Sequence, residues 1–447
     1  MSAFQWLPAH VINDIVGYVA DEAAGASAKQ LLLVSHRWRR AVLRHINREY
    51  TIDLRQQTTP GTIAISNKYE TLSFDAADNI AADELTVRMA ANVNCLRIAV
   101  GVQEVFSGEA ARILGLLVQS GRLVCMRLRR LVFALGHAPY VNADPEHATS
   151  GAERLARWIR QLAPRAHDVA FVEAAGFTGR RKASRSSLDM RRQGALHANM
   201  LMHLLGRASH MDVGNLGPTY FADKWVLGDR QLTSIRCLLD DGGHMAQVVR
   251  SSSPSLESLW VNAHSALAPA SILCDASGQP TQYPRLRVLT FKHAGRETVY
   301  PEIDREFAPV PRLERLVLHG ACAFNEVLFR GNTGTLRSLA ADVDMRMARV
   351  LQTVGPLESL QHAEMDCWAD YMWSGQAGEF VDVAVGVAPN AVVLSLGAHL
   401  VDVAGVLAPR LAASRCAQSL RVLRLRGIEL SRGDAAIIAN ACPRLVS

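Results

Sequence analysis

The stretch Leu313-Glu314-Arg315-Leu316-Val317-Leu318-His319-Gly320 decides how this 447-residue chain folds. If it forms a strand, Leu316 and Leu318 lie on one face and Val317 on the other, because side chains alternate along a strand with a period of two. One such strand cannot bury its leucine face alone. The fold therefore depends on whether the same spacing returns elsewhere.

This L-x-x-L-x-L spacing returns, in close or looser copies, at Leu123, Leu232, Leu256, Leu286, Leu336, Leu357 and Leu420. The middle hydrophobic residues of the candidate strands are Ile52, Leu72, Leu96, Met126, Val169, Met211, Ile235, Leu259, Leu289, Leu316, Leu339, Leu360, Leu394 and Leu423. Most of them are about 20–30 residues apart. Helical periodicity occupies segments 110–119, 154–162, 195–205, 344–354 and 434–441. The chain is therefore predicted to alternate strands and helices.

Strand and helix repeated at this period resemble the leucine-rich repeat, in which stacked neighbours bury the face that one unit leaves open. The resemblance implies an α/β solenoid over residues 51–447, with parallel strands on its concave side and helices on its convex side. Insertions are expected near 137–150, 179–192 and 274–284. The basic second insertion is interpreted as a solvated loop; a nuclear-localisation signal, a phosphorylation site and a contact for an acidic partner are the alternatives.

Residues 1–50 have a different pattern and are predicted to form a small all-helical head. Leu7-Pro8 precedes apolar residues at helical spacing over 11–19, and proline suits the first turn of a helix. A small polar segment, 21–27, follows. A second helical stripe over 31–45 contains Trp38. The order is helix, loop, helix.

Leu7-Pro8 together with Leu33-Val34-Ser35-His36-Arg37-Trp38 resembles the F-box, most of all its divergent fungal members. Ala9 stands where that family usually has an acidic residue, and the loop at 20–28 replaces its usual middle segment. The resemblance implies docking to the Skp-type linker protein of a cullin–RING ubiquitin ligase, with Trp38 anchoring the helices to one another. The implied linker-binding residues are Leu7, Pro8, Val11, Ile12, Ile15 and Val34. A helical cap over the first repeat is the alternative.

Composition excludes several classes of protein. With 49% hydrophobic and 20% charged residues the chain is too apolar to be disordered, and its apolar runs are too short for a transmembrane helix. Its eight cysteines include no C-x-x-C pair, which argues against a zinc ribbon or a thioredoxin-like motif. Cys125 and Cys237 are expected as buried thiols in repeat strands, and a reducing cytosolic or nuclear location is the default expectation. The net charge of +6 comes mostly from dispersed basic residues, so nucleic-acid binding is not indicated.

No sequence motif for catalysis, a cofactor or a metal is present, and a non-catalytic protein is expected. Binding residues are instead sought at strand positions between the buried leucines. The candidate target-binding residues are Arg127, Arg129, Trp260, Asn262, Lys292, His319, Arg424 and Arg426. Trp260 is the strongest of them, because tryptophan is enriched in interface hot spots. Packing of this side chain against a neighbouring strand is the open alternative.

These features predict the substrate-recognition adaptor of a Skp–cullin–F-box ubiquitin ligase, whose head binds the linker and whose repeats bind a protein target. The first alternative is a repeat scaffold unconnected with ubiquitin. The second is a hydrolase or transferase with an unrecognised site. The closing segment 442–447 is predicted to begin another repeat strand.

Overall fold

The computed structural model forms two compact units, Met1–Trp225 (unit 1) and Val226–Ser447 (unit 2). Both units are α/β, with a mostly parallel sheet and helices. The residues that the structure describes are 11–12, 15–16, 35–46, 48–54, 62–67, 71–75, 93–101, 104–105, 107–119, 125–136, 145–173, 208–215, 232–239, 244–263, 268–275, 277–293, 307–319, 326–368, 377–399 and 403–446. The predicted boundary at residue 50 stays a prediction.

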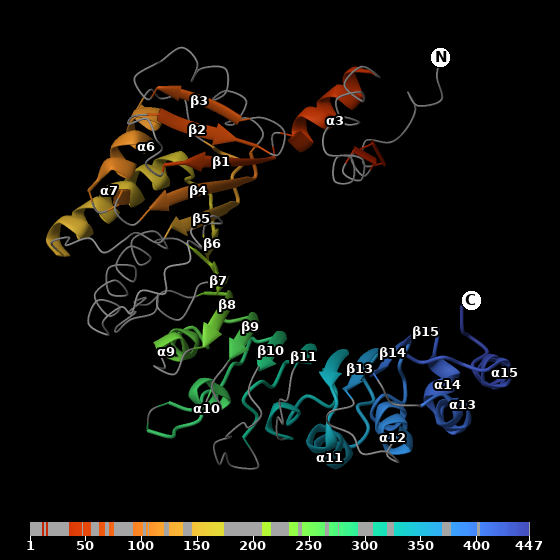
Figure 1. Cartoon of the computed structure of the whole chain (residues 1–447). Helices are drawn as coiled ribbons and strands as arrows, with labels where there is room; N and C mark the ends of the chain where they lie inside the picture. The colour runs from red at the N-terminus through yellow and green to blue at the C-terminus, as the bar shows by residue number, and fades with distance from the viewer. Residues whose placement is uncertain are drawn as a thin grey trace, which may run out of the picture. The chain divides into compact units, whose positions relative to one another are not determined.

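The sheet of unit 1 has the strand order β7-β6-β5-β4-β1-β2-β3 (Figure 1). Its strands are β1 (Glu49–Asp53), β2 (Thr62–Ser66), β3 (Thr71–Asp75), β4 (Cys95–Gly101), β5 (Arg130–Gly136), β6 (Asp168–Glu173) and β7 (His210–Asn215). Neighbours from β1 through β4 to β7 are parallel, whereas the β1–β2 and β2–β3 pairs are antiparallel. The expectation of parallel strands throughout was therefore wrong for β2 and β3, and Leu72, which lies in β3, marks no parallel repeat.

The helices of unit 1 are α3 (His36–Ile46), α6 (Glu109–Gln119) and α7 (Pro145–Leu162) among the described residues. Helices α6 and α7 pack against each other (Figure 1). Gly115 of α6 permits this close approach, because a Cβ there would come within 2.9 Å of the Trp158 indole of α7. The predicted helix at 110–119 is confirmed. The insertion expected near 137–150 was wrong in part, since α7 already begins at Pro145.

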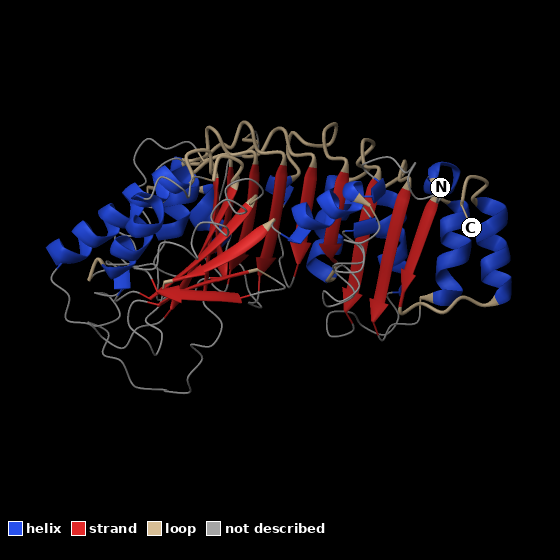
Figure 2. Ribbon diagram, turned by 90° about the horizontal axis from the view of Figure 1, so that it is seen from above, coloured by secondary structure: helices blue, strands red, loops and turns tan. Residues whose placement is uncertain are grey.

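Among its described residues, unit 2 has eight parallel strands that follow one another in sequence order, with the helices on one face (Figures 1 and 2). The strands are β8 (Ser234–Leu239), β9 (Ser258–Ala263), β10 (Val288–His293), β11 (Arg315–His319), β12 (Ser338–Asp342), β13 (His362–Trp368), β14 (Val393–His399) and β15 (Val422–Arg426). The helices are α9 (His244–Ser251), α10 (Ala268–Leu273), η3 (Glu326–Leu328), α11 (Met345–Val354), α12 (Ala377–Val387), α13 (Ala404–Ala413), α14 (Cys416–Ser419) and α15 (Arg432–Ala441). The helices predicted at 344–354 and 434–441 are confirmed, and the one at 195–205 lies outside the described residues.

One row of side chains in unit 2 explains why the leucine spacing produces this sheet. The row runs in register through Ile235, Leu259, Leu289, Leu316, Leu339, Ala363, Leu394 and Leu423. All are buried except Leu423, which is half-buried on β15. In β9 burial alternates strictly, so Leu259 and Val261 face the core and Trp260 does not. The period-two prediction is confirmed there.

Two strands begin later than predicted. The sequence spacing predicts Leu360 as the middle residue of a strand, yet β13 begins at His362 and Ala363 occupies the aligned position. Met126 was assigned likewise, but Leu131 of β5 aligns with Leu96, and Met126 is 47% exposed. In both cases an early leucine fills the turn before the strand. For these two strands the L-x-x-L-x-L pattern therefore predicts a start that is several residues too early in the sequence.

The remaining predicted insertions have different outcomes. The described residues of the segment 274–284 form no regular element apart from an isolated bridge between Cys274 and Pro280, as expected for a loop. The basic segment 179–192 lies outside the described residues. No helix in the described part of the chain is both long and apolar enough to cross a membrane.

Candidate functional site

The loops that precede the parallel strands are joined by a repeated pair of backbone hydrogen bonds. The Glu257 carbonyl accepts from the N–H groups of Arg287 (2.9 Å) and Val288 (3.1 Å), and the next strand repeats the arrangement. The accepting carbonyls belong to Arg48, Asn94, Arg129 and His167 in unit 1, and to Thr233, Glu257, Arg287, Glu314, Arg337, Gln361 and Val392 in unit 2. In each unit these loops gather along the edge of its own sheet at which the parallel strands begin (Figure 2), and we call it the strand-start edge of that unit. Successive loops therefore place one side chain about every 4.8 Å.

At the strand-start edge of unit 1 lies a cavity of about 1060 Å³, which we call the basic cavity. It is lined by Arg48, Glu49, Asn94, Cys95, Met126, Arg127, Leu128, Arg129, Arg130, Val132, Arg165 and His167. Five arginines and one glutamate give the lining a net charge of +4 with histidine neutral. All five arginines are exposed. The cavity is thus open to solvent and strongly positive.

Four of the five guanidinium groups have no acidic partner within the described residues: those of Arg48, Arg127, Arg129 and Arg165. Arg130 is different, because its guanidinium lies 3.8 Å from Asp168 and 3.7 Å from a carboxylate oxygen of Asp212. Unpaired arginine can still form bidentate hydrogen bonds to a carboxylate or phosphate group. The basic cavity therefore offers most of its donors to a ligand.

Cys95 is the group in the basic cavity that could act as a nucleophile, and its environment opposes this. Burial, and then the charge of Glu49, raise the pKa of the Cys95 thiol. A raised pKa keeps the thiol protonated near neutral pH, whereas the thiolate is the reactive form. The neighbouring His167 is engaged with backbone, its Nδ1 being 3.2 Å from the Arg165 carbonyl oxygen. The cavity is suited to binding.

Unit 2 has a smaller cavity at its own strand-start edge, of about 580 Å³, which serves as an internal comparison. It is lined by Glu257, Arg285, Arg287, Arg312, Glu314, Gly334, Thr335 and Arg337. Arg287 binds Glu314 through its Nε (2.9 Å) and Nη2 (2.6 Å). With four arginines and two glutamates in its lining, this second cavity has a net charge of +2, which is lower than that of the basic cavity.

Arg127 and Arg129 were predicted to lie on a strand beside Leu128, and this placement was wrong. Both precede β5, in the turn and loop that line the basic cavity. The cause is the late start of β5 described above. The two residues remain exposed and close to other arginines, so their candidacy for binding does not depend on the incorrect strand.

Other predicted target-binding residues meet on the face of unit 2 that is opposite its helices, which we call the open face. Trp260 is half-buried there, and the Arg236 guanidinium on the adjacent strand lies 4.2 Å from its ring centroid. Asn262, Lys292 and His319 are aligned in register on β9, β10 and β11. Trp260 therefore packs against a neighbouring strand, as its alternative interpretation proposed, and remains partly accessible.

Arg426 is joined to acidic residues of the open face. Its Nη2 lies 2.8 Å from Glu364 and 2.7 Å from Asp366, both on β13, two strands away from β15. Gly397 lies between them in register, and a Cβ there would overlap the Asp366 carboxylate. Arg424 aligns with Ser395 and is exposed. Of these two predicted target-binding arginines, Arg426 is therefore paired with Glu364 and Asp366, whereas Arg424 forms no ion pair with them.

Replacement of Gly397 by alanine is expected to disturb this ionic contact. The added methyl group must displace the Asp366 carboxylate from Arg426, and loss of such a partly exposed ion pair costs about 0.2–1 kcal/mol of unfolding free energy. Gly386→Ala is the matched control, because a Cβ at that exposed position of α12 meets nothing within 4 Å. Denaturant unfolding of both variants is the measurement. Equal stability of the two would contradict the role assigned to Gly397.

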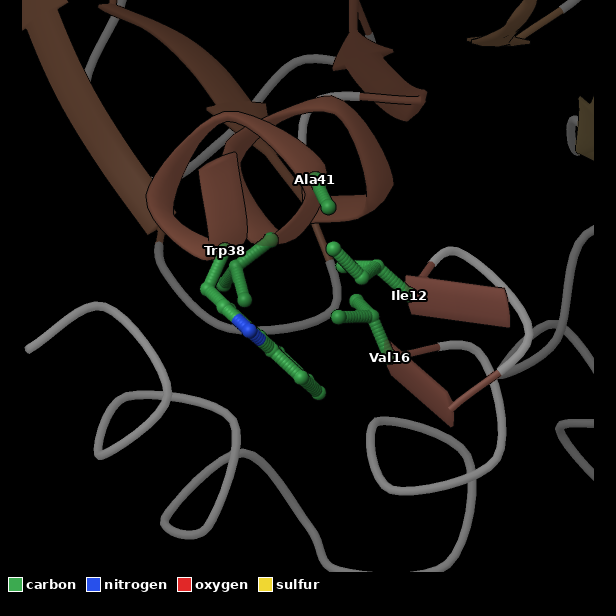
Figure 3. Close-up of a cluster of buried hydrophobic side chains, with 5 residues drawn as sticks. Ile12, Val16, Trp38 and Ala41 are labelled. Atoms are coloured by element: carbon green, nitrogen blue, oxygen red, sulfur yellow. The ribbon is translucent and has the colours of Figure 1, made fainter. Parts of the chain in front are cut away.

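The head contains a small apolar core formed by two helical segments (Figure 3). Ile12 and Val16 pack with Trp38, Ala41 and Val42, all less than 9% exposed. The Ser35 hydroxyl accepts from the Trp38 N–H at 3.4 Å, where α3 begins. The expectation that Trp38 anchors the helices is confirmed.

The residues predicted to bind the linker divide into three groups. Ile12 is 2% exposed and belongs to the core of the head. Val11 and Ile15 are half-buried, and Ile15 packs against the same core. Leu7, Pro8 and Val34 lie outside the described residues. Val11 and Ile15 are therefore the described members with apolar surface left for a partner.

Cysteine and metal chemistry find little support in the described ranges. Burial raises the pKa of Cys125 to about 12 and the pKa values of Cys367 and Cys416 to about 11. Such thiols remain protonated at neutral pH. Cys237 is buried in β8 as predicted, whereas Cys125 is buried ahead of β5. Within these ranges no group of three or more histidine, cysteine or acidic side chains is placed to hold a metal ion.

Sequence reasoning missed several members of these surfaces, among them Arg48, Arg165 and His167 in the basic cavity. Arg48 and His167 each stand directly before a strand, so correct strand starts would have predicted that they lie along the same edge of the sheet. The incorrect start assigned to β5 prevented this prediction. Comparison of the sequence with protein-family models and with curated proteins found no match.

Proposed function

We propose that this protein is the substrate-recognition adaptor of a Skp–cullin–F-box ubiquitin ligase, acting in the cytoplasm or nucleus. The head would bind the Skp-type linker protein, and the repeats would hold a protein target. The protein itself would perform no bond chemistry. Its contribution is to raise the concentration of the target near the ubiquitin-carrying enzyme, as linked binding modules do.

The leucine-rich-repeat-like solenoid of this proposal is supported by the aligned strands. Adjacent parallel strands in unit 2 follow sequence order, and the first leucine of the pattern is fully buried at Leu256, Leu313, Leu336 and Leu420. The apolar side chains of each strand are therefore buried against those of the neighbouring strands, as in stacked repeats. Such a sheet also presents half-exposed side chains from many strands on one face, which suits a macromolecular target.

The observation that carries the adaptor role is the division of the first helical segment of the head. Ile12 and Val16 contact Trp38 within the core, while Val11 and Ile15 keep part of their surface. A helix with its core face already occupied can offer these other aliphatic side chains to a partner. This is the arrangement that docking to a linker protein requires.

Binding of the purified chain to the Skp-type linker of its own organism tests this role. Leu7→Ala/Pro8→Ala and Val11→Asp/Ile15→Asp variants are expected to bind at least tenfold more weakly, because apolar interface area is lost or charged. Arg424→Gln, far along the sequence in β15, is the control and should bind normally. Circular dichroism establishes that each variant remains folded. Absence of binding by the folded original chain would refute the adaptor role.

A repeat scaffold unconnected with ubiquitin is the second candidate, and Ile12 favours it. This predicted linker-binding residue is used inside the head, as it would be in a helical cap. In that case the two double variants of the head lower the stability of the chain without weakening its binding to any partner. Binding at the basic cavity and at the open face is then unchanged. The linker-binding experiment separates the two functions.

A further inference from the structure

We propose that the outer edge of β15 binds an extended peptide that alternates apolar and acidic residues and so adds a strand to the sheet of unit 2. This inference goes beyond the proposed function, since it applies whether or not the head binds a linker protein. Among the described strands β15 lies at one end of the order, with β14 as its one neighbour (Figure 1). A strand in this position presents unpaired backbone N–H and C=O groups to another chain.

The outward backbone groups of β15 follow from its pairing with β14. The Val422 N–H donates to the Val392 carbonyl at 3.1 Å, on the side of β14. In a parallel sheet, successive residues of a strand direct their N–H and C=O groups to opposite sides. Leu423 and Leu425 therefore direct these groups away from β14. They are the donors and acceptors with which an added strand would pair.

The start of this outer edge already has the geometry of a strand-to-strand contact. The Val446 N–H donates to the Arg421 carbonyl at 2.9 Å. The Arg421 N–H itself donates to the Val392 carbonyl at 2.9 Å, one residue before β15 begins. The contact of Val446 thus repeats the one with which β15 joins β14. A parallel strand can continue along the edge from this point.

The apolar side chains of β15 are incompletely covered. Leu423 and Leu425 are half-buried, whereas Leu394 and Leu396, which are aligned with them on β14, are fully buried. The difference arises because β14 has a described strand on each side and β15 has one on a single side. Apolar side chains on an added strand would cover the remaining surface of the two leucines.

The charge around β15 favours an acidic partner. Residues 421–446 contain five arginines and two acidic residues, a net charge of +3. Arg424 is exposed and has no acidic partner among the described residues. The Arg426 guanidinium is held by Glu364 and Asp366, two strands inside the edge. A glutamate or aspartate of an added strand, opposite Arg424, would form a favourable cross-strand pair.

A second copy of this chain fits the same edge less well. If two β15 strands paired antiparallel over their full length, each Arg424 would lie opposite the Arg424 of the other copy. Like charges directly opposite each other destabilise a sheet. The net charge of +3 over residues 421–446 would add repulsion between the two ends. The acidic peptide avoids both costs.

The test is fluorescence anisotropy of the full chain with the labelled peptide Gly-Ser-Leu-Glu-Leu-Glu-Leu-Ser-Gly. This peptide is expected to bind at least tenfold more tightly than its counterpart with lysine in place of glutamate, because only the glutamates attract Arg424. A second control peptide carries N-methyl groups on two adjacent central residues, one of which must direct its N–H to β15. It keeps the side chains but should bind at least tenfold more weakly, because strand addition depends on main-chain hydrogen bonds.

Three variants of the chain locate the site. Arg424→Glu should weaken binding of the acidic peptide at least fivefold and strengthen binding of the lysine peptide. Arg315→Glu is the matched control and should change neither, because Arg315 is an exposed arginine of β11, four strands from the edge. Leu425→Pro removes one outward N–H, which an edge strand tolerates, and should weaken binding of the acidic peptide at least fivefold. Circular dichroism establishes that each variant is folded.

Four results would overturn the inference. Equal binding of the acidic and lysine peptides would refute the choice of an acidic partner, and undiminished binding of the N-methylated peptide would refute strand addition. Equal loss in Arg424→Glu and Arg315→Glu would place the peptide elsewhere. The fourth is a dimer of the chain, detected by sedimentation, that Leu425→Pro abolishes, because a second copy would then occupy the edge.

Discussion

Replacement of Trp38 by alanine is expected to lower the free energy of unfolding of the head by about 3–5 kcal/mol, as for other large aromatic side chains removed from a core. The indole is 4% exposed and contacts Ile12, Val16, Ala41 and Val42 from two helical segments. Its loss leaves a cavity that so small a core cannot refill. Hydrogen exchange of the amides of α3 measures the effect directly.

The control for this variant is Leu43→Ala in the same helix. Leu43 is 40% exposed, so its truncation should change stability by about 0.5 kcal/mol or less. If the head is the linker-binding module, Trp38→Ala also lowers linker binding while Leu43→Ala affects it less. Similar exchange rates in the two variants would show that the packing in Figure 3 does not stabilise the head.

Replacement of Asn332 by leucine is expected to destabilise unit 2 by about 2–4 kcal/mol, because buried polar groups lose their partners. Asn332 is completely buried. Its Oδ1 accepts from the Leu313 N–H at 3.1 Å, and its Nδ2 donates to the Leu328 carbonyl at 2.9 Å. Leucine of similar volume can form neither bond. The Leu313 N–H then keeps only a longer contact of 3.3 Å with the Val310 carbonyl.

Thr335→Val provides the comparison for Asn332→Leu. The Thr335 hydroxyl donates to the Leu313 carbonyl at 3.0 Å, but this side chain is only half-buried, so the groups left behind can be reached by water. The expected loss is about 1 kcal/mol, typical of a single hydrogen bond. Chemical denaturation of both variants distinguishes the two values. An Asn332→Leu variant as stable as Thr335→Val would contradict the importance given to the buried amide.

The alternation of buried and exposed side chains along a strand could be predicted from the sequence, because it depends only on residues that are neighbours in the chain. The stretch 313–320 predicted the buried Leu316 and Leu318 of β11, but Val317, predicted on the opposite face of that strand, is buried as well. The marker leucines of β9, β10, β12 and β14 proved to be in register. Strand starts were less secure. In β13 and β5 a hydrophobic residue in the preceding turn satisfies the same spacing, so Leu360 and Met126 were assigned too early.

The basic cavity and the ionic contact of Arg426 could not be predicted in the same way. The cavity combines residues from four loops, separated by segments of unequal length between residues 48 and 167. Arg426 reaches Asp366 across an intervening strand, and Gly397 permits this only because it lacks a side chain. Such contacts depend on which strands are neighbours and on their register. Local spacing alone does not contain that information.

The alternation of buried and half-exposed residues along β9 has a further consequence for how such a protein can evolve. Leu259, Val261 and Ala263 are held by the interior, while Trp260 and Asn262 face outward. Selection for a stable chain and selection for a new partner therefore act on different positions of the same strand. The outward residues can be exchanged one strand at a time, and the inherited scaffold can acquire new specificity without rebuilding its interior.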